Sequence, residues 1–82
     1  MDDVTLKGFR LGRGVRQVDI AQHWGVSQQR VGAVEAGPIP RLLVGTLADY
    51  VAAAGGRLVV GAEVAGGVMV PLYWRPEGEI RG

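Results

Sequence analysis

The chain has 82 residues, with nine lysines and arginines against eight aspartates and glutamates, so its formal net charge is +1. This length suffices for one domain, and the absence of cysteine excludes disulfides and thiolate metal sites. No apolar run approaches the ~20 residues that a membrane span needs, and Asp2 and Asp3 stand where a secretion signal would carry positive charge, so we expect a cytoplasmic protein without a membrane partner.

Short apolar repeats separated by glycines predict two helices at the start of the chain. The first spans residues 4–11, and Gly14 follows its end. The second spans residues 17–24. The expected inward-facing side chains are Leu6 and Phe9 in the first helix and Ile20, Ala21 and Trp24 in the second. The cations of the first segment, Lys7, Arg10 and Arg13, lie either beside an anionic partner or on a solvated helix face.

A glycine and a serine predict a sharp turn into a third helix. Gly25 stops the second helix, because glycine readily adopts the positive φ of a helix C-terminus. Ser27 offers its hydroxyl to the free N–H groups of the next helix, which we predict from Ser27 to Ala36. Val31 and Val34 form its buried face, and a glycine–proline pair ends it.

The rest of the chain changes from helical to strand periodicity. A loop at residues 38–40 leads into a fourth predicted helix over residues 41–54. Segments 57–64 and 68–74 are rich in β-branched and aromatic residues on either side of an Ala-Gly-Gly turn, which predicts a β-hairpin. Pro71 cannot donate to a strand ladder, so we expect an edge or a bulge there. The expected apolar face of the fourth helix comprises Leu43, Leu47, Tyr50, Val51 and Ala54. The fold class is therefore mainly α with a C-terminal β-hairpin.

Two short helices joined by a tight turn, with polar side chains at the start of the second, suit the major groove of DNA. Glutamine pairs with adenine, arginine with guanine or a phosphate, and a small apolar residue with the thymine methyl group. A solvated surface would explain the same side chains. The predicted base contacts are Gln28, Gln29, Arg30 and Ala33, and the predicted phosphate contacts include Gln17 and Ser27.

These residues together resemble the Cro/cI-type (XRE) helix-turn-helix family. The resemblance rests on residues 15–21, 25–28, 31 and 34–37, and it covers about residues 6–55. It implies a lambda-repressor-like bundle of four to five helices that binds double-stranded DNA. Family members commonly have threonine or serine where this chain has Arg16, so we expect either another cap for that helix or a phosphate contact from Arg16.

A narrower resemblance covers residues 46–58, which are similar to the C-terminal half of XRE-type antitoxins of bacterial toxin–antitoxin modules. It implies a homodimeric repressor that binds an inverted repeat in its own promoter and a toxin protein. The alternative is a phage or prophage regulator without a toxin partner. One histidine, no cysteine and no phosphate loop leave little for catalysis, so we expect no enzyme, cofactor or metal.

The hairpin has two alternative roles. It either covers the helical core of its own chain or pairs with a second copy, and we favour pairing because so short a chain needs additional apolar burial. The expected dimer or partner interface comprises Leu58, Val60, Val64, Val70 and Trp74. The predicted organisation is a DNA-binding domain at residues 1–56, the hairpin at 57–75 and a flexible tail at 76–82.

Overall fold

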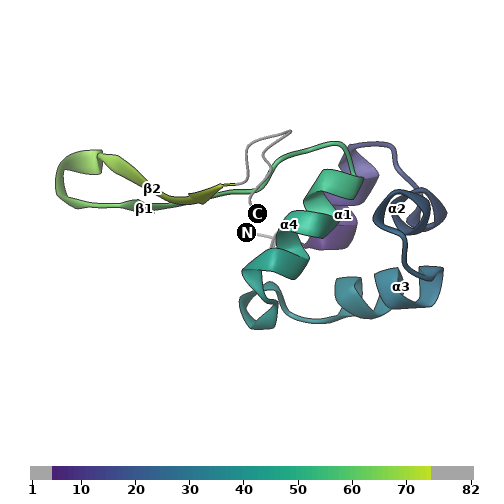
Figure 1. Cartoon of the computed structure of the whole chain (residues 1–82). Coiled ribbons are helices and arrows are strands. Elements are labelled where there is room, and N and C mark those ends of the chain that lie inside the picture. Colours follow the sequence, from purple (N-terminus) through teal and green to yellow (C-terminus); the bar gives the residue numbers. More distant parts are fainter. Residues whose placement is uncertain (1–4, 75–82) are drawn as a thin grey trace, which may run out of the picture.

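The computed structural model describes residues 5–74, in which four α-helices precede a β-hairpin (Figure 1). The predicted fold class is confirmed, whereas the predicted tail lies outside the described residues. No helix within residues 5–74 is long and apolar enough to cross a membrane. The elements are α1 (Leu6–Gly12), α2 (Gln17–Trp24), α3 (Gln28–Ala36), the 3-10 turn η1 (Ile39–Arg41), α4 (Val44–Ala53), β1 (Val59–Glu63), the 3-10 turn η2 (Ala65–Gly67) and β2 (Met69–Trp74).

Local capping residues set the bounds of the first three helices. Thr5 accepts a hydrogen bond from the Gly8 N–H at 3.0 Å, so α1 begins at residue 6 instead of the predicted residue 4. The predicted bounds of α2 are confirmed, and Gly25 follows it with φ 82°. Ser27 Oγ then accepts from the Arg30 N–H at 3.0 Å, which confirms its predicted role at the start of α3.

The core lies between the four helices. Ile20, Val31 and Tyr50 have no exposed surface, and they join α2, α3 and α4. Trp24 lies at the edge of this core, where its ring meets that of Tyr50 edge-on with centroids 6.4 Å apart. The burial of these side chains removes apolar surface from water, which is the main stabilising contribution in a domain of this size.

The predicted start of the fourth helix is wrong. The turn η1 replaces the expected loop, and α4 begins at Val44, because Leu42 and Leu43 both have an extended backbone with ψ 144°. Leu43 is therefore outside the helix and 75% exposed, so it does not belong to the predicted apolar face. The other four residues of that face lie in or against the core.

The hairpin projects from the helical body and makes no extensive contact with any helix (Figure 1). The alternative in which it covers its own helical core is thus wrong. Gly61 pairs with Pro71 and Val60 pairs with Tyr73, so Leu72 is an additional residue that forms a bulge next to the proline, as predicted. Exposed apolar side chains cover much of its surface: Val59, Val64, Val68, Met69, Val70 and Leu72.

Candidate nucleic-acid interface

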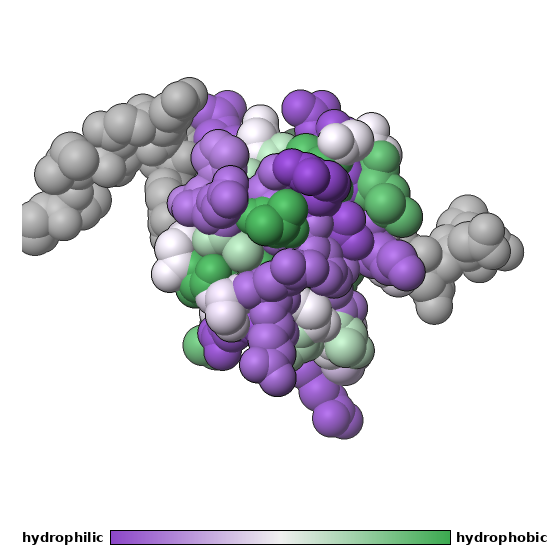
Figure 2. Space-filling model, turned by 90° about the vertical axis from the view of Figure 1, so that its right-hand side faces the viewer, coloured by the Kyte–Doolittle hydropathy of each residue, from purple (hydrophilic) through white to green (hydrophobic). Residues whose placement is uncertain are grey.

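The helices α2 and α3 and the turn between them present a largely hydrophilic face to solvent (Figure 2). The four residues predicted to contact bases are all exposed on α3: Gln28, Gln29, Arg30 and Ala33. Three of them lie in its first turn, which a protruding helix can bring closest to base edges. The structure therefore brings the predicted base contacts together on one accessible surface.

A chain of side-chain amides connects the start of α3 to the start of α2. Gln28 Nε2 donates to Gln17 Oε1 at 3.4 Å, and Gln17 Nε2 donates to Glu35 Oε1 at 3.1 Å. Because an amide nitrogen carries two protons, Gln17 and Gln28 each keep one N–H for a further acceptor. This arrangement fixes the orientation of both amides and leaves a donor on each for a phosphate or a base.

Behind this surface, an ion pair joins α1 to α3. Arg10 Nε donates to Glu35 Oε2 at 2.6 Å and Arg10 Nη2 donates to Glu35 Oε1 at 3.3 Å, while the two side chains are 8% and 5% exposed. Arg10 Nη1 also donates to the Val15 carbonyl at 3.0 Å. Both options considered for Arg10, an exposed helix face or a flank of the DNA, are therefore wrong, because its guanidinium is buried.

Tyr50 completes this cluster from α4. Its hydroxyl donates to Glu35 Oε2 and lies 3.2 Å from the Leu6 carbonyl oxygen. Burial alone would raise the pKa of Glu35, but hydrogen bonds from Arg10, Tyr50 and Gln17 stabilise the carboxylate and hold its pKa below the usual value. Burial and the adjacent carboxylate raise the pKa of the Tyr50 hydroxyl. We name Arg10, Gln17, Glu35 and Tyr50 the buried polar cluster.

A second carboxylate, that of Asp19, lies at the start of α2, where Arg16 occupies the N-cap position and its side chain accepts no hydrogen bond from the helix. Asp19 Oδ2 accepts from the Arg16 backbone N–H at 3.0 Å and from Arg16 Nε at 3.1 Å. The hydrogen bonds from Arg16 hold the pKa of Asp19 below its usual value. The Arg16 side chain is still 77% exposed, so it remains accessible to a phosphate at the edge of the α2–α3 face.

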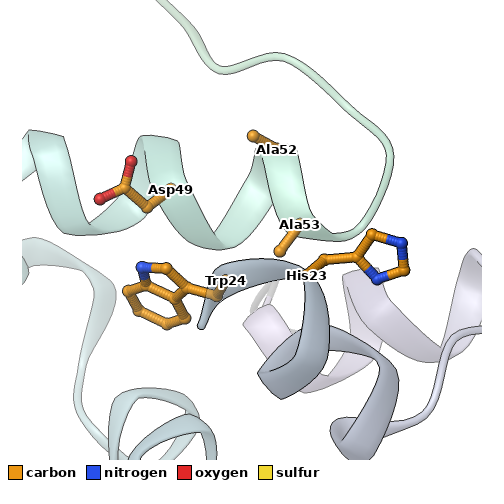
Figure 3. Close-up of a pocket in the computed structure, with 5 residues that line it drawn as sticks. All are labelled: His23, Trp24, Asp49, Ala52 and Ala53. Atoms are coloured by element: carbon orange, nitrogen blue, oxygen red, sulfur yellow. The ribbon is translucent and has the colours of Figure 1, made fainter. Parts of the chain in front are cut away.

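A pocket between α2 and α4 lies apart from the predicted DNA contacts (Figure 3). His23, Trp24, Asp49, Ala52 and Ala53 line it. His23 Nδ1 lies 2.9 Å from the Asp19 carbonyl oxygen, so the ring is anchored to its own helix. Within residues 5–74 no group of three or more potential ligands is placed to hold a metal ion.

Sequence reasoning missed Arg10 and Tyr50 as members of a polar cluster. It also did not identify the partners of Glu35, which forms an ion pair and hydrogen bonds. The partners come from α1 and α4, 25 and 15 residues away along the chain, so no local spacing indicates them. The one sign in the sequence of a buried polar contact was Arg10, which follows Phe9 on the apolar side of the first helix.

No family model matches the chain. It is 50% identical over 48 residues to the putative antitoxin HigA3 of Mycobacterium tuberculosis (strain ATCC 25618 / H37Rv), an alignment that covers 58% of this chain. The chain thus matches 44% of the length of that curated relative.

Two solved structures are similar to the chain over most of its length. One is the structure of a HigA antitoxin described as inducing DNA bending by unique dimerization. It is 43% identical to this chain, with a TM-score of 0.77, and the match covers 87% of this chain and 97% of that one. The other is the DNA-bound antitoxin HigA3. It is 39% identical to this chain, with a TM-score of 0.78, and the match covers 89% of this chain and 94% of that one. Their likeness includes both the helices and the hairpin, because it covers more than the helical residues alone.

Proposed function

The chain belongs to the family of HigA antitoxins, and on this basis we propose that it is a homodimeric repressor that binds an inverted repeat in DNA and neutralises a toxin protein. The observation that carries the proposal is the exposed first turn of α3, held by an amide chain and a buried ion pair, in a fold shared with a DNA-bound antitoxin. A phage regulator without a toxin is not favoured, because the named relatives are antitoxins.

In this proposal α2 and α3 form a Cro/cI-type helix-turn-helix. Gln28, Gln29 and Arg30 contact bases, and Ala33 packs against a thymine methyl group. The phosphates are bound by Arg16, Gln17 and the turn at Ser27. Residues 1–56 form the DNA-binding domain and residues 57–75 the dimerisation or partner-binding element. The protein acts at a promoter in the cytoplasm.

The test is operator binding by purified variants. The operator is first selected from randomised DNA, which also reports half-site spacing and symmetry. We expect Gln28→Ala to weaken binding by ~1–3 kcal/mol and to relax the preference at one base pair in each half-site. Gln22→Ala is the matched control, because Gln22 is also an exposed glutamine of the motif but lies outside the predicted contacts. If Gln28→Ala and Gln29→Ala both behave like the control, the proposed base contacts are wrong.

The toxin partner requires a separate experiment. The chain is co-expressed with the product of the neighbouring gene, and growth and complex formation are measured. An antitoxin restores growth and co-purifies with that product, whereas a free-standing regulator does neither. The hairpin is the proposed partner surface, because it exposes several large apolar side chains and exposed apolar patches often mark interaction sites. A charge substitution at Leu72, which is 66% exposed, should therefore reduce rescue without reducing helical content.

A further inference from the structure

The segment that joins α4 to the hairpin begins with two glycines whose backbone is bonded to α4. The Gly55 N–H donates to the Ala52 carbonyl at 3.0 Å, and the Gly56 N–H donates to the Val51 carbonyl at 2.9 Å. Gly55 has φ 89°, which residues with a side chain rarely adopt. These are the two hydrogen bonds of a Schellman motif, which ends a helix with one defined backbone geometry. The end of α4 therefore determines the direction in which the chain continues.

Close packing against α1 and α4 holds the same segment. A Cβ atom added at Gly56 would lie 3.1 Å from Val51 Cγ1 and 3.5 Å from Phe9 Cζ, so a larger residue would have to displace its neighbours. A Cβ atom added at Gly55 would lie 3.8 Å from Arg13 Nη2, which places a cation near the C-terminus of α4, where the helix dipole favours it. The chain passes beside α1 in this segment before it runs to β1 (Figure 1). We name these five residues the junction.

A fixed junction matters for a protein that binds two half-sites of DNA with two copies. One base pair adds ~3.4 Å along the duplex and turns it by about a tenth of a full turn. A flexible connection between the copies can adjust to such a change, whereas a rigid connection prevents both copies from binding at once. The rigidity of the junction therefore bears on which operators are bound.

We propose that the junction determines the spacing of half-sites that the protein accepts, because it fixes the direction of the hairpin relative to α3. Gly55 and Gly56 are then positioning residues for DNA specificity, although they belong to neither helix of the predicted DNA-binding face. The inference rests on the proposed homodimeric repressor and names the residues that set its spacing preference.

Operators of altered spacing test the inference. Fluorescence anisotropy measures the affinity of the wild type for the selected operator and for versions with one base pair added to or removed from the spacer between the half-sites. The same operators are tested with Gly55→Ala, which disfavours the left-handed backbone, and with Gly56→Ala, which crowds Val51. We expect the wild type to lose affinity for both altered operators by about tenfold or more. Each variant should lose less than about threefold or prefer a different spacer.

Gly14→Ala is the matched control. Gly14 also has a positive φ, 72°, and an open Cβ position, but it lies outside the junction. The substitution therefore adds a similar backbone strain and should keep the wild-type spacing preference. Circular dichroism checks that each variant retains its helices.

A measurement on the otherwise unaltered chain tests the rigidity itself, whether or not the junction variants fold. The chain has no cysteine, so spin labels can be placed at Gln22→Cys on α2 and Val64→Cys on the hairpin, both at exposed positions. Pulsed EPR on labelled protein diluted with unlabelled wild type reports the distance within one chain. We expect a distribution as narrow as that of a reference pair within the helical body, Lys7→Cys with Gln22→Cys.

The outcomes separate this inference from the proposed function. Altered spacing selectivity in the junction variants, together with wild-type selectivity in Gly14→Ala, supports the inference. Three results would overturn it and leave the proposed repressor standing: a wild type that binds all three operators alike, folded junction variants that match either the wild type or Gly14→Ala, or a hairpin distance distribution much broader than the reference. A wild type that selects no two-fold repeat from randomised DNA overturns the proposed function itself.

Discussion

At the scale of single residues, one carboxylate connects three helices to α3. Glu35 accepts hydrogen bonds from Arg10 on α1, Gln17 on α2 and Tyr50 on α4. No buried side-chain polar atom in the described part of the chain lacks a partner. A satisfied buried cluster tolerates few substitutions, because removing one partner leaves the others desolvated and unpaired. The position of α3 therefore depends on residues that lie behind its exposed face.

Glu35→Gln should lower the free energy of unfolding at pH 7 by about 3–5 kcal/mol, because Arg10 would then be buried without its counter-ion. The folded-state pKa of Glu35 is below its unfolded value, so its contribution is full above the usual carboxyl range and is lost as the pH falls through the lowered pKa. The difference between wild type and Glu35→Gln should therefore shrink in acid. Urea unfolding at pH 7 and pH 3 measures both effects.

The exposed Glu63→Gln is the matched control for this substitution and should change the unfolding free energy by less than about 0.5 kcal/mol. Equal effects of the two substitutions at pH 7 would show that the buried ion pair contributes no more than a surface charge does.

At the scale of elements, predictions succeeded where the signal was local. The bounds of α2 and the start of α3 follow from Gly25 and Ser27, each of which acts on neighbouring residues. The predicted start of α4 was wrong, because Leu42 and Leu43 have an extended backbone after a short 3-10 turn. The spacing of apolar residues in the sequence does not indicate this turn. The predicted contacts on α3 are all exposed, but their partners in DNA stay a prediction.

The left-handed conformation of Gly25 gives a test at this scale. An added Cβ would have no atomic clash there, so Gly25→Ala isolates the backbone cost of φ 82°, which is about 1–2 kcal/mol. Gly12→Ala is the opposite control: Gly12 is the last residue of α1, its φ is ordinary and its Cβ position is open. We expect it to stabilise the protein by up to about 1 kcal/mol. Thermal unfolding should thus move in opposite directions for the two variants.

At the scale of the whole molecule, the helical body and the hairpin are separate units joined through residues 54–58. The principal extents of 42 × 41 × 23 Å reflect a hairpin that extends sideways from a small bundle. The sequence predicted both units, but it could not decide whether the hairpin folds back onto the helices. Whether the hairpin packs on the helices depends on whether the apolar faces of the two units match in shape. The spacing of apolar residues along the sequence does not give that shape.

This separation affects how the protein can be inactivated by proteolysis. Arg57 is exposed in the segment between α4 and β1, so brief trypsin treatment should cut there before it cuts within the helices. Mass spectrometry identifies the first product, and initial cuts within residues 6–53 would contradict the expectation. The released bundle would keep α3 but lose the hairpin, so under the proposed function one nick would leave a monomer that binds each half-site independently and weakly. A protease could then end the proposed repression without cutting the proposed DNA-binding surface.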